Sequence, residues 1–102
     1  MSEKITILGI EYEIERVPCI SKDEFLLGQI DYIRQKILID GSISEEKAQV
    51  VLLHEIIHGI LEALGMNDEN QNETMIQGLA AALYVCFKSN LKLPSGSFEK
   101  EE

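Results

Sequence analysis

The amino-acid sequence predicts an α+β fold in which a small antiparallel sheet packs against a central helix and a second, C-terminal helix. Three observations lead to this prediction. Apolar and polar residues alternate in two early segments, a long and almost continuous apolar run follows, and a second apolar segment comes after a polar connection. Strands followed by helices in this order are typical of an α+β domain.

The first strands are expected between residues 4 and 17, which have the sequence KITILGIEYEIERV. Apolar residues alternate with polar ones along this segment, which is the pattern of a strand with one buried face. Gly9 interrupts the run, so we expect a hairpin or a bent strand there, and Pro18 ends it. Residues 19–28 show no clean period and fit a loop or a short helical turn.

A second hairpin is expected in the sequence QIDYIRQKILID, which follows directly. Its two β-rich pieces cover about residues 29–33 and 36–40. The turn between them lacks the usual Asn-Gly or Gly-Gly pair. Together the two segments predict an antiparallel sheet.

A long central helix is predicted over about residues 44–64. Ser42 or Ser44 can cap its N-terminus, and Ser42 followed three residues later by Glu45 fits a capping box. Gly65 stands where a C-cap glycine is expected, so the helix should end just before it.

The second helix is expected to begin near Asn70 or Asn72 and to run to about Asn90. The last residues of the chain are polar and terminal. We therefore assign residues 1–93 to a single domain and residues 94–102 to a polar, flexible tail.

Composition and charge argue against several classes of protein. A chain of 102 residues suffices for one domain but not for two. Its 18 Asp and Glu residues against 9 Lys and Arg residues give a formal net charge of −9, which disfavours binding to nucleic acid or to an anionic membrane. The two cysteines are too few for a disulfide framework, and no segment fits a signal peptide or a membrane span. We therefore expect reduced thiols and a cytoplasmic location.

The central helix contains His54, Glu55 and His58 in the pattern HExxH. Residues four apart in a helix project from one face, a turn apart, so both imidazoles can reach a single Zn²⁺ ion. Glu55 lies beside them and can act as a general base on a zinc-activated water. The motif therefore predicts a catalytic zinc site.

The residues around the motif are apolar almost all round the helix, so we expect the helix to be buried between other elements. Its ionisable side chains, Glu62 included, fall within about one quarter of its circumference. Such groups cost stability unless they are paired or bind a metal, which favours the zinc site. The competing interpretation is two hydrogen-bonded core histidines, with Glu55 and Glu62 pointing to solvent.

A catalytic zinc site needs a third protein ligand, and the chain contains no third histidine. The metzincin extension of the motif is excluded because Leu61 and Leu64 stand where it requires Gly and His. Three carboxylates after the helix remain as candidates, namely Asp68, Glu69 and Glu73.

Glu73 is the strongest of these, because it continues the apolar face of the second helix and that face should pack on the central helix. The face is drawn through Ile76, Ala80, Leu83 and Phe87. Glu73 also has capping-box spacing from Asn70, so it has an alternative role as a helix cap. Asp68 is the runner-up, as a ligand from the connecting loop.

The sequence VLLHEIIHGILEALG, followed by NETMIQGLAAALYVCFKSN, resembles the small HExxH proteins of phages and prophages in Gram-positive bacteria. These are similar to ImmA/IrrE-type and other minimal zincin-like metallopeptidases, and the resemblance is strongest over about residues 29–90. It implies a small antiparallel sheet, a gluzincin-like zinc site and hydrolysis of peptide bonds. Carried over to this chain, it implies His54, His58 and Glu73 as ligands and Glu55 as the general base.

The sequence thus predicts a metallopeptidase with Zn²⁺ as its cofactor and a peptide or protein as its substrate. An extended peptide can add to an exposed sheet edge, for which we suggest the strand from Lys36 to Asp40. The alternative is a catalytically silent, zinc-stabilised adaptor that binds a host protein, and Glu55 distinguishes the two because only hydrolysis needs it. The residue that steadies the developing oxyanion stays open among Tyr12, Tyr32, Tyr84, Arg16 and Arg34.

Overall fold

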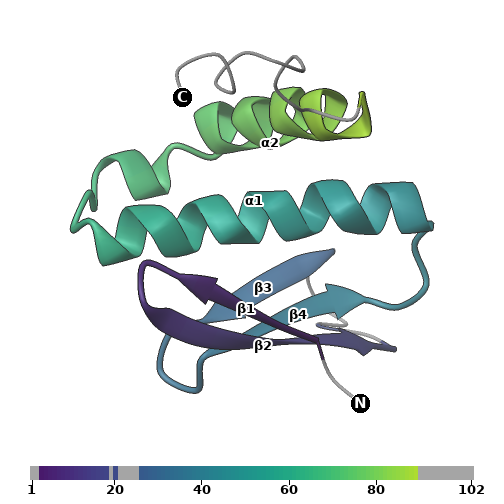
Figure 1. Cartoon of the computed structure of the whole chain (residues 1–102), viewed down its shortest axis with the longest axis horizontal. Coiled ribbons are helices and arrows are strands. Elements are labelled where there is room, and N and C mark those ends of the chain that lie inside the picture. The colour runs from purple at the N-terminus through teal and green to yellow at the C-terminus, as the bar shows by residue number, and fades with distance from the viewer. Residues whose placement is uncertain (1–2, 19, 21–25, 90–102) are drawn as a thin grey trace, which may run out of the picture.

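The computed structural model describes residues 3–18, 20 and 26–89, and these residues form three layers (Figure 1). A four-stranded sheet is the first layer, a long helix lies across one face of it, and a second helix packs on the other side of the long helix. The predicted α+β class is confirmed. Along the chain the elements are β1 (Glu3–Ile7), β2 (Ile10–Val17), β3 (Gly28–Asp31), β4 (Lys36–Asp40), α1 (Glu45–Ala63), the 3₁₀ helix η1 (Glu69–Gln71) and α2 (Glu73–Lys88).

The first predicted hairpin is present, because β1 and β2 pair antiparallel. Its turn places Leu8 at φ 48° and Gly9 at φ 87°. A left-handed conformation costs glycine nothing, so Gly9 supplies what this tight turn requires.

The second predicted hairpin is formed by β3 and β4. Asp31 stabilises its turn, since its Oδ1 accepts hydrogen bonds from the backbone N–H groups of Ile33 (3.0 Å) and Arg34 (2.9 Å). Gln35 completes the reversal at φ 57°. An aspartate turn of this kind reverses the chain without the Asn-Gly pair that the sequence lacks.

The sheet is mixed, so the prediction of an antiparallel sheet is wrong at one junction. The strand order is β1-β2-β4-β3, and β2 and β4 run parallel. β4 takes the inner position because it is strongly apolar, with Ile37 and Ile39 only 0% and 2% exposed. As a result β4 is not a free edge, and the suggestion that a peptide pairs with Lys36–Asp40 is wrong. Among the described strands, β1 and β3 are the edges.

α1 packs on the sheet close to its backbone. The buried residues of this layer are Ile7, Tyr12, Ile37, Ile39 and Ala48. Gly59 permits the close approach, because a Cβ atom there would lie 2.8 Å from Ile7 Cδ1 and 3.1 Å from Ile30 Cδ1. The sheet therefore fixes the position of the middle of α1, where the HExxH motif lies.

The observed bounds of α1 agree with the prediction to within a residue. Ser44 caps the helix, since its Oγ accepts a hydrogen bond from the backbone N–H of Lys47 at 3.2 Å. The other candidate, Ser42, instead lies with its Oγ 2.7 Å from Asp40 Oδ1. Gly65 follows the helix at φ 73°, as expected of a C-cap glycine.

α2 packs on α1 through its N-terminal half. Ile76 and Ala80 are fully buried, in one cluster with Ile57 and Leu61 of α1. This contact brings the first turn of α2 close to the middle of α1, which is the approach that the sequence predicted.

The packing face of α2 is shorter than predicted. Leu83 and Phe87 were expected on it, yet they are 37% and 51% exposed. Of the described elements, α1 is the main one that α2 contacts, so the C-terminal half of α2 has little apolar surface against which to pack.

Several predictions concern parts of the chain outside the described residues. These are the polar tail over residues 94–102, the end of the second helix at Asn90, and most of the segment 19–28. Within the described part, neither helix combines the length and the apolar character needed to cross a membrane.

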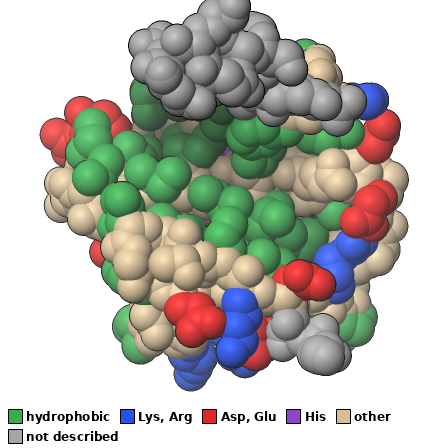
Figure 2. All heavy atoms as spheres, in the orientation of Figure 1, with side chains coloured by type: hydrophobic (Ala, Val, Ile, Leu, Met, Phe, Trp, Pro, Cys, Tyr) green, Lys and Arg blue, Asp and Glu red, His purple; other side chains and the backbone are tan. Residues whose placement is uncertain are grey.

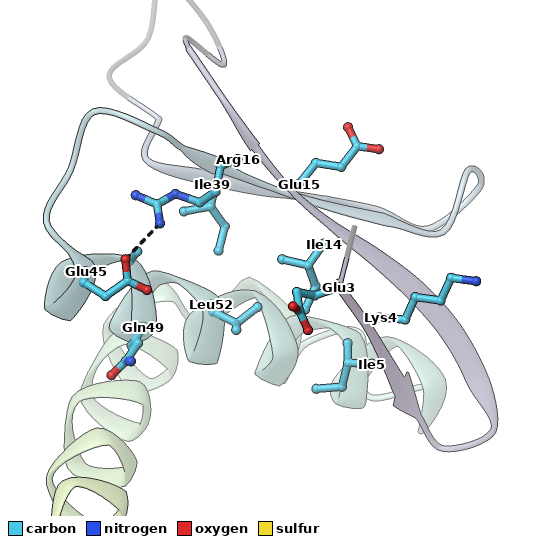
Figure 3. A pocket seen from close by; sticks show the side chains of 11 residues that line it. Glu3, Lys4, Ile5, Ile14, Glu15, Arg16, Ile39, Glu45, Gln49 and Leu52 are labelled. Carbon is cyan, nitrogen blue, oxygen red and sulfur yellow. Dashed lines mark hydrogen bonds and ion pairs between the residues drawn. The ribbon is translucent and has the colours of Figure 1, made fainter. Parts of the chain in front are cut away.

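An open hollow of about 800 Å³ lies between the β1–β2 hairpin and the N-terminal half of α1 (Figure 3). Ile5, Ile14 and Leu52 give it apolar walls, and the ion pair of Arg16 with Glu45, 3.3 Å long, lies at one side. Hydrophobic side chains also gather over the middle of the face drawn in Figure 2. The helix residues that line this hollow belong to a different face of α1 from the two histidines, so the hollow is separate from the HExxH motif.

Candidate metal centre

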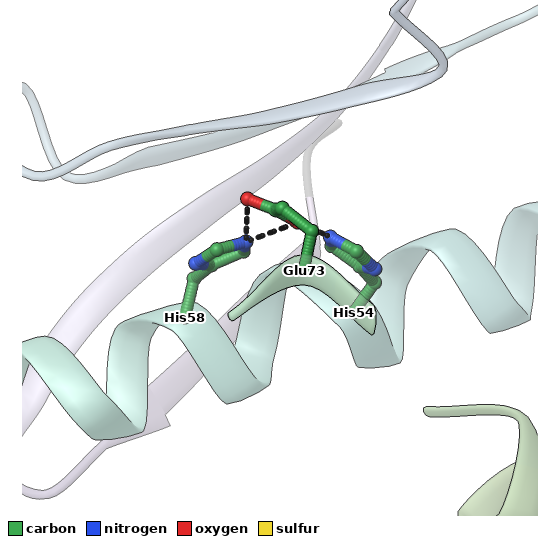
Figure 4. A group of neighbouring side chains, drawn as sticks. All are labelled: His54, His58 and Glu73. Carbon is green, nitrogen blue, oxygen red and sulfur yellow. Dashed lines mark hydrogen bonds and ion pairs between the residues drawn. The ribbon is translucent and has the colours of Figure 1, made fainter. Parts of the chain in front are cut away.

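His54 and His58 lie one turn apart in α1, and both rings point toward the start of α2 (Figure 4). Their ring centroids are 5.0 Å apart, close to the helical pitch of about 5.4 Å. Their side chains are 19% and 12% exposed. The pair is therefore mostly buried but still reachable from solvent.

Glu73 is the first residue of α2, and its carboxylate lies against both rings (Figure 4). Its Oε1 is 3.0 Å from His54 Nε2, and His58 Nε2 is 3.3 Å from the same carboxylate. One possible ligand atom from each of the three residues lies within 4.8 Å of the others. The structure thus brings together the three residues that the HExxH motif and the facial argument selected.

Glu73 is free to face α1 because another residue caps α2. Asn72 is the N-cap, and its Oδ1 accepts a hydrogen bond from the backbone N–H of Met75 at 3.0 Å. The alternative in which Asn70 and Glu73 form a capping box is not found, because the side chain of Asn70 contacts His58 instead.

A chain of hydrogen bonds holds the ring of His58. Its Nδ1 lies 2.7 Å from Asn70 Oδ1, the Nδ2 of Asn70 donates to the hydroxyl of Tyr32 at 3.2 Å, and that hydroxyl donates to the backbone carbonyl of His58 at 3.4 Å. Because Asn70 donates to Tyr32 through its nitrogen, its oxygen faces the ring and accepts a hydrogen bond from the Nδ1–H group of His58.

His54 is held in the same way from α2. Its Nδ1 lies 2.8 Å from Gln77 Oε1. Gln77 follows Glu73 by four residues, so both side chains project from the same face of α2. One turn of α2 therefore presents a carboxylate to one nitrogen of His54 and an amide oxygen to the other.

These contacts determine what the three groups can bind. When Nδ1–H of a neutral imidazole donates a hydrogen bond to an amide oxygen, Nε2 carries a lone pair. Both Nε2 atoms and the carboxylate of Glu73 then direct electron pairs into one space, which is repulsive unless a cation or a proton lies between them. Two imidazole nitrogens and a carboxylate oxygen are a donor set that zinc takes in catalytic sites, so the residues fit this metal.

Glu55 lies beside this group and is only 7% exposed. Its carboxylate has no hydrogen bond or ion pair with any described residue, and it lines a pocket of about 410 Å³. Burial raises the pKa of this carboxyl, while the charges of His54 and His58 act in the opposite direction. The part of the competing interpretation in which Glu55 points to solvent is therefore wrong. The hydrogen-bonded histidines and the exposed Glu62 that it expected are both found.

Gly28, the first residue of β3, keeps the space around Glu55. A Cβ atom at this position would lie 3.0 Å from Glu55 Oε2 and would collide with the side chain of Val51. Only a glycine lets β3 approach α1 this closely without displacing Glu55. The end of an edge strand therefore lies directly beside the unpartnered carboxylate.

Tyr32 is the oxyanion candidate that lies at the site. Together with His58 and Glu73 it lines a polar hollow of about 420 Å³, and its hydroxyl is engaged in orienting the ring of His58. The other candidates are placed elsewhere: Tyr12 is buried in the core, Tyr84 lies 5.8 Å from Lys88 Nζ, and Arg16 and Arg34 form ion pairs with Glu45 and Asp31.

Asp68 and Glu69 do not belong to the group around the histidines. Asp68 precedes η1 and Glu69 opens it, and both side chains are exposed. The runner-up ligand therefore lies apart from the two rings.

Sequence reasoning missed the two amides that hold the histidines, and it missed Gly28. The four-residue spacing from Glu73 to Gln77 was a usable signal, since it places both on one helix face. Asn70 and Gly28 gave no comparable signal, because their contacts join segments far apart in the chain.

Comparisons of the chain with protein-family models, with curated proteins and with solved structures give no match.

Proposed function

We propose that the chain is a zinc-dependent peptidase whose metal is held by His54, His58 and Glu73. One observation supports the proposal most strongly. Three possible metal ligands converge next to Glu55, a buried carboxylate with no partner among the described residues. Structural zinc sites are closed by four protein ligands, whereas three leave a position open. When bound, zinc lowers the pKa of a coordinated water to about 7 and polarises a carbonyl group.

In the proposed reaction Glu55 moves the proton. It takes a proton from the attacking water as the water oxygen adds to the scissile carbonyl carbon. It then delivers that proton to the nitrogen as the C–N bond breaks, so that the products are a carboxylic acid and an amine. Burial raises the pKa of Glu55 toward the working pH, which is the direction that favours a group that both accepts and releases a proton.

β3 is the element that would align a peptide substrate. It pairs with β4 on one side, and none of the described strands pairs with its other side. An extended peptide could add there as a further strand through backbone hydrogen bonds. Because Gly28 lies against Glu55, such a peptide would pass beside the proposed general base.

Glu73→Ala is expected to weaken zinc binding by more than about a hundredfold, because removing a ligand should exceed the 10- to 100-fold cost of losing an outer-shell partner. Asp68→Ala and Glu69→Ala are matched controls, since they remove exposed carboxylates that lie apart from the histidines. Competition with a chromophoric chelator at fixed pH gives the affinities. A larger loss in Asp68→Ala than in Glu73→Ala would mean that the loop, not α2, supplies the ligand.

The peptidase itself is tested by metal removal and return. The purified chain with one equivalent of zinc is incubated with a mixed peptide library, and the cleavage products are read by mass spectrometry. We expect cleavage to stop when a chelator removes the metal and to return when zinc is restored. A chain that binds zinc and cleaves no peptide in the library would contradict the proposal.

The adaptor is the second candidate, and one observation favours it. From its middle to its C-terminal end, α2 exposes large apolar side chains, a feature typical of surfaces that bind another protein. These are Leu79, Leu83, Val85 and Phe87, which are 37–62% exposed. An adaptor would gain stability from zinc without hydrolysing peptides, so the library experiment separates the two functions.

A further inference from the structure

The pocket next to Glu55 extends along one face of α1 and ends at a cation. The pocket is lined from α1 by Lys47, Val50, Val51, His54 and Glu55, from α2 by Gln77, and from the segment that leads into β3 by Leu26, Leu27 and Gly28. The helix residues follow at intervals of three and four, so they form one stripe. The pocket therefore has apolar walls, with the proposed general base toward one end of the helix stripe and Lys47, an exposed residue, at the other end.

Lys47 is unusual among the described cations because it has no ion-pair partner within the described part of the chain. Every other described cation forms an ion pair, and these are Lys4, Arg16, Arg34, Lys36 and Lys88. No described residue makes a side-chain hydrogen bond or an ion pair with Lys47. In a chain with a net charge of −9, carboxylates are abundant, so a cation left unpaired at a pocket is notable.

The length of the pocket fits a short peptide. Lys47 precedes His54 by seven residues, which is about 10 Å along the helix axis. An extended peptide rises about 3.3 Å per residue, so about three residues span this distance. A carboxylate within three residues of the cleaved bond would thus come close to the ammonium group, while the residues between would contact Leu27 and Val50.

We propose that Lys47 is a specificity-determining residue that selects substrates with a carboxylate within about three residues of the cleaved bond. The carboxylate is either an Asp or Glu side chain or the free C-terminus of the peptide. This inference rests on the proposed peptidase function. The pocket on the His54 side of the metal centre would then bind short apolar peptide segments that end in a negative charge.

The test starts from a peptide that the library shows to be cut. Each of the three residues on either side of the cut bond is replaced in turn by Glu, Gln or Lys, with both peptide ends blocked. On one side of the bond we expect kcat/KM to favour Glu over Gln by about fivefold, the upper range for one exposed ion pair, and this preference should shrink in high salt. A second series ends one to three residues after the cut, as free acid or as amide, and separates a side-chain carboxylate from a C-terminal one.

Two variants identify Lys47 as the cause. In Lys47→Met the preference for Glu over Gln should disappear, and in Lys47→Glu the preferred residue should become Lys. Lys4→Glu is the matched control, because it makes the same change in net charge on β1, outside this pocket. A preference that is equal in the wild type, Lys47→Met and Lys47→Glu would overturn the inference while leaving the peptidase intact.

Binding provides a readout that does not need catalysis. The tripeptide Leu-Ala-Glu and its Gln counterpart, each as the amide, are titrated into isotope-labelled protein while the backbone amides of Leu27, Lys47 and Val50 are followed by NMR. We expect the acidic peptide to bind about fivefold more tightly, and we expect no difference in Lys47→Met. If no library peptide is cut but this difference is present, the peptidase fails and the pocket assignment stands. Equal binding of both peptides overturns the assignment.

Discussion

His54→Ala and His58→Ala are each expected to abolish stoichiometric zinc binding. The proposed site has three protein ligands, and either variant leaves one imidazole and a carboxylate that is 65% exposed. Losing an outer-shell partner costs metal affinity about 10- to 100-fold, so losing a ligand should cost more than about a hundredfold. Metal analysis of the wild type, purified without chelator, should find one zinc per chain, and each variant should contain a small fraction of that.

Thermal unfolding gives a second measure of the same effect. A ligand that binds only the folded state raises the free energy of unfolding, so zinc should raise the unfolding midpoint of the wild type. The midpoints of His54→Ala and His58→Ala should not respond to the same zinc concentration. Gln49→Ala is the control, because Gln49 is exposed on another face of α1 and should leave the response unchanged. Full zinc occupancy in both histidine variants would remove the basis of the metal site.

The local elements of the fold were predictable because their signals lie within a few neighbouring residues. Alternation over residues 4–17 predicted the β1–β2 hairpin, and Gly9 marked its turn. A serine before the long apolar run and Gly65 after it marked both ends of α1. Each of these features depends on backbone conformation and capping, which are short-range effects.

The joining of the two hairpins was not predictable in the same way. Alternation shows which face of a strand is buried but not which strand lies beside it, so the parallel pairing of β2 with β4 has no local signal. One long-range contact agrees with this pairing. Lys36 at the start of β4 forms an ion pair with Glu15 of β2, in which Nζ lies 3.1 Å from Oε2. Such a pair can be interpreted once the strand order is known, but it does not determine that order.

The candidate site likewise contains residues that local patterns predict and residues that they do not. The convergence of His54, His58 and Glu73 could be anticipated, because helical spacing places the histidines and the apolar face of α2 places the carboxylate. The predicted packing face of α2 was too long, because only its N-terminal part packs on α1. Asn70 and Gln77 hydrogen-bond the Nδ1 atoms of the two rings. These contacts depend on how α1 and α2 pack together, which no local sequence pattern determines.

Glu55→Gln is expected to reduce peptide hydrolysis by at least about a hundredfold, the usual scale of general-base catalysis. Glutamine has nearly the same shape as glutamate, so the packing beside Gly28 and Val51 should survive the change. Zinc content should stay at the wild-type level, because Glu55 is not one of the three converging ligand groups. Hydrolysis rates and metal analysis on the same preparations check both expectations.

The loss of activity in Glu55→Gln should not be accompanied by a loss of stability. A buried carboxylate without a partner is costly in free energy when it is ionised, and the amide carries no charge. We therefore expect the metal-free Glu55→Gln protein to unfold at the same temperature as the wild type or at a higher one. Glu46→Gln is the matched control, since it makes the same chemical change at an exposed position of α1, where the ion pair with Lys88 contributes little.

The combination of results separates a catalytic carboxylate from a structural one. A residue kept only for packing would lose stability when changed and would leave a peptidase working, whereas a general base loses activity and not stability. Hydrolysis that continues unchanged in Glu55→Gln would point to a contaminating protease. The wild type could instead bind zinc and cut no peptide, while the Glu55→Gln variant is more stable than the wild type. The burial of this carboxylate would then have no catalytic reason, and the adaptor would be the better explanation of the site.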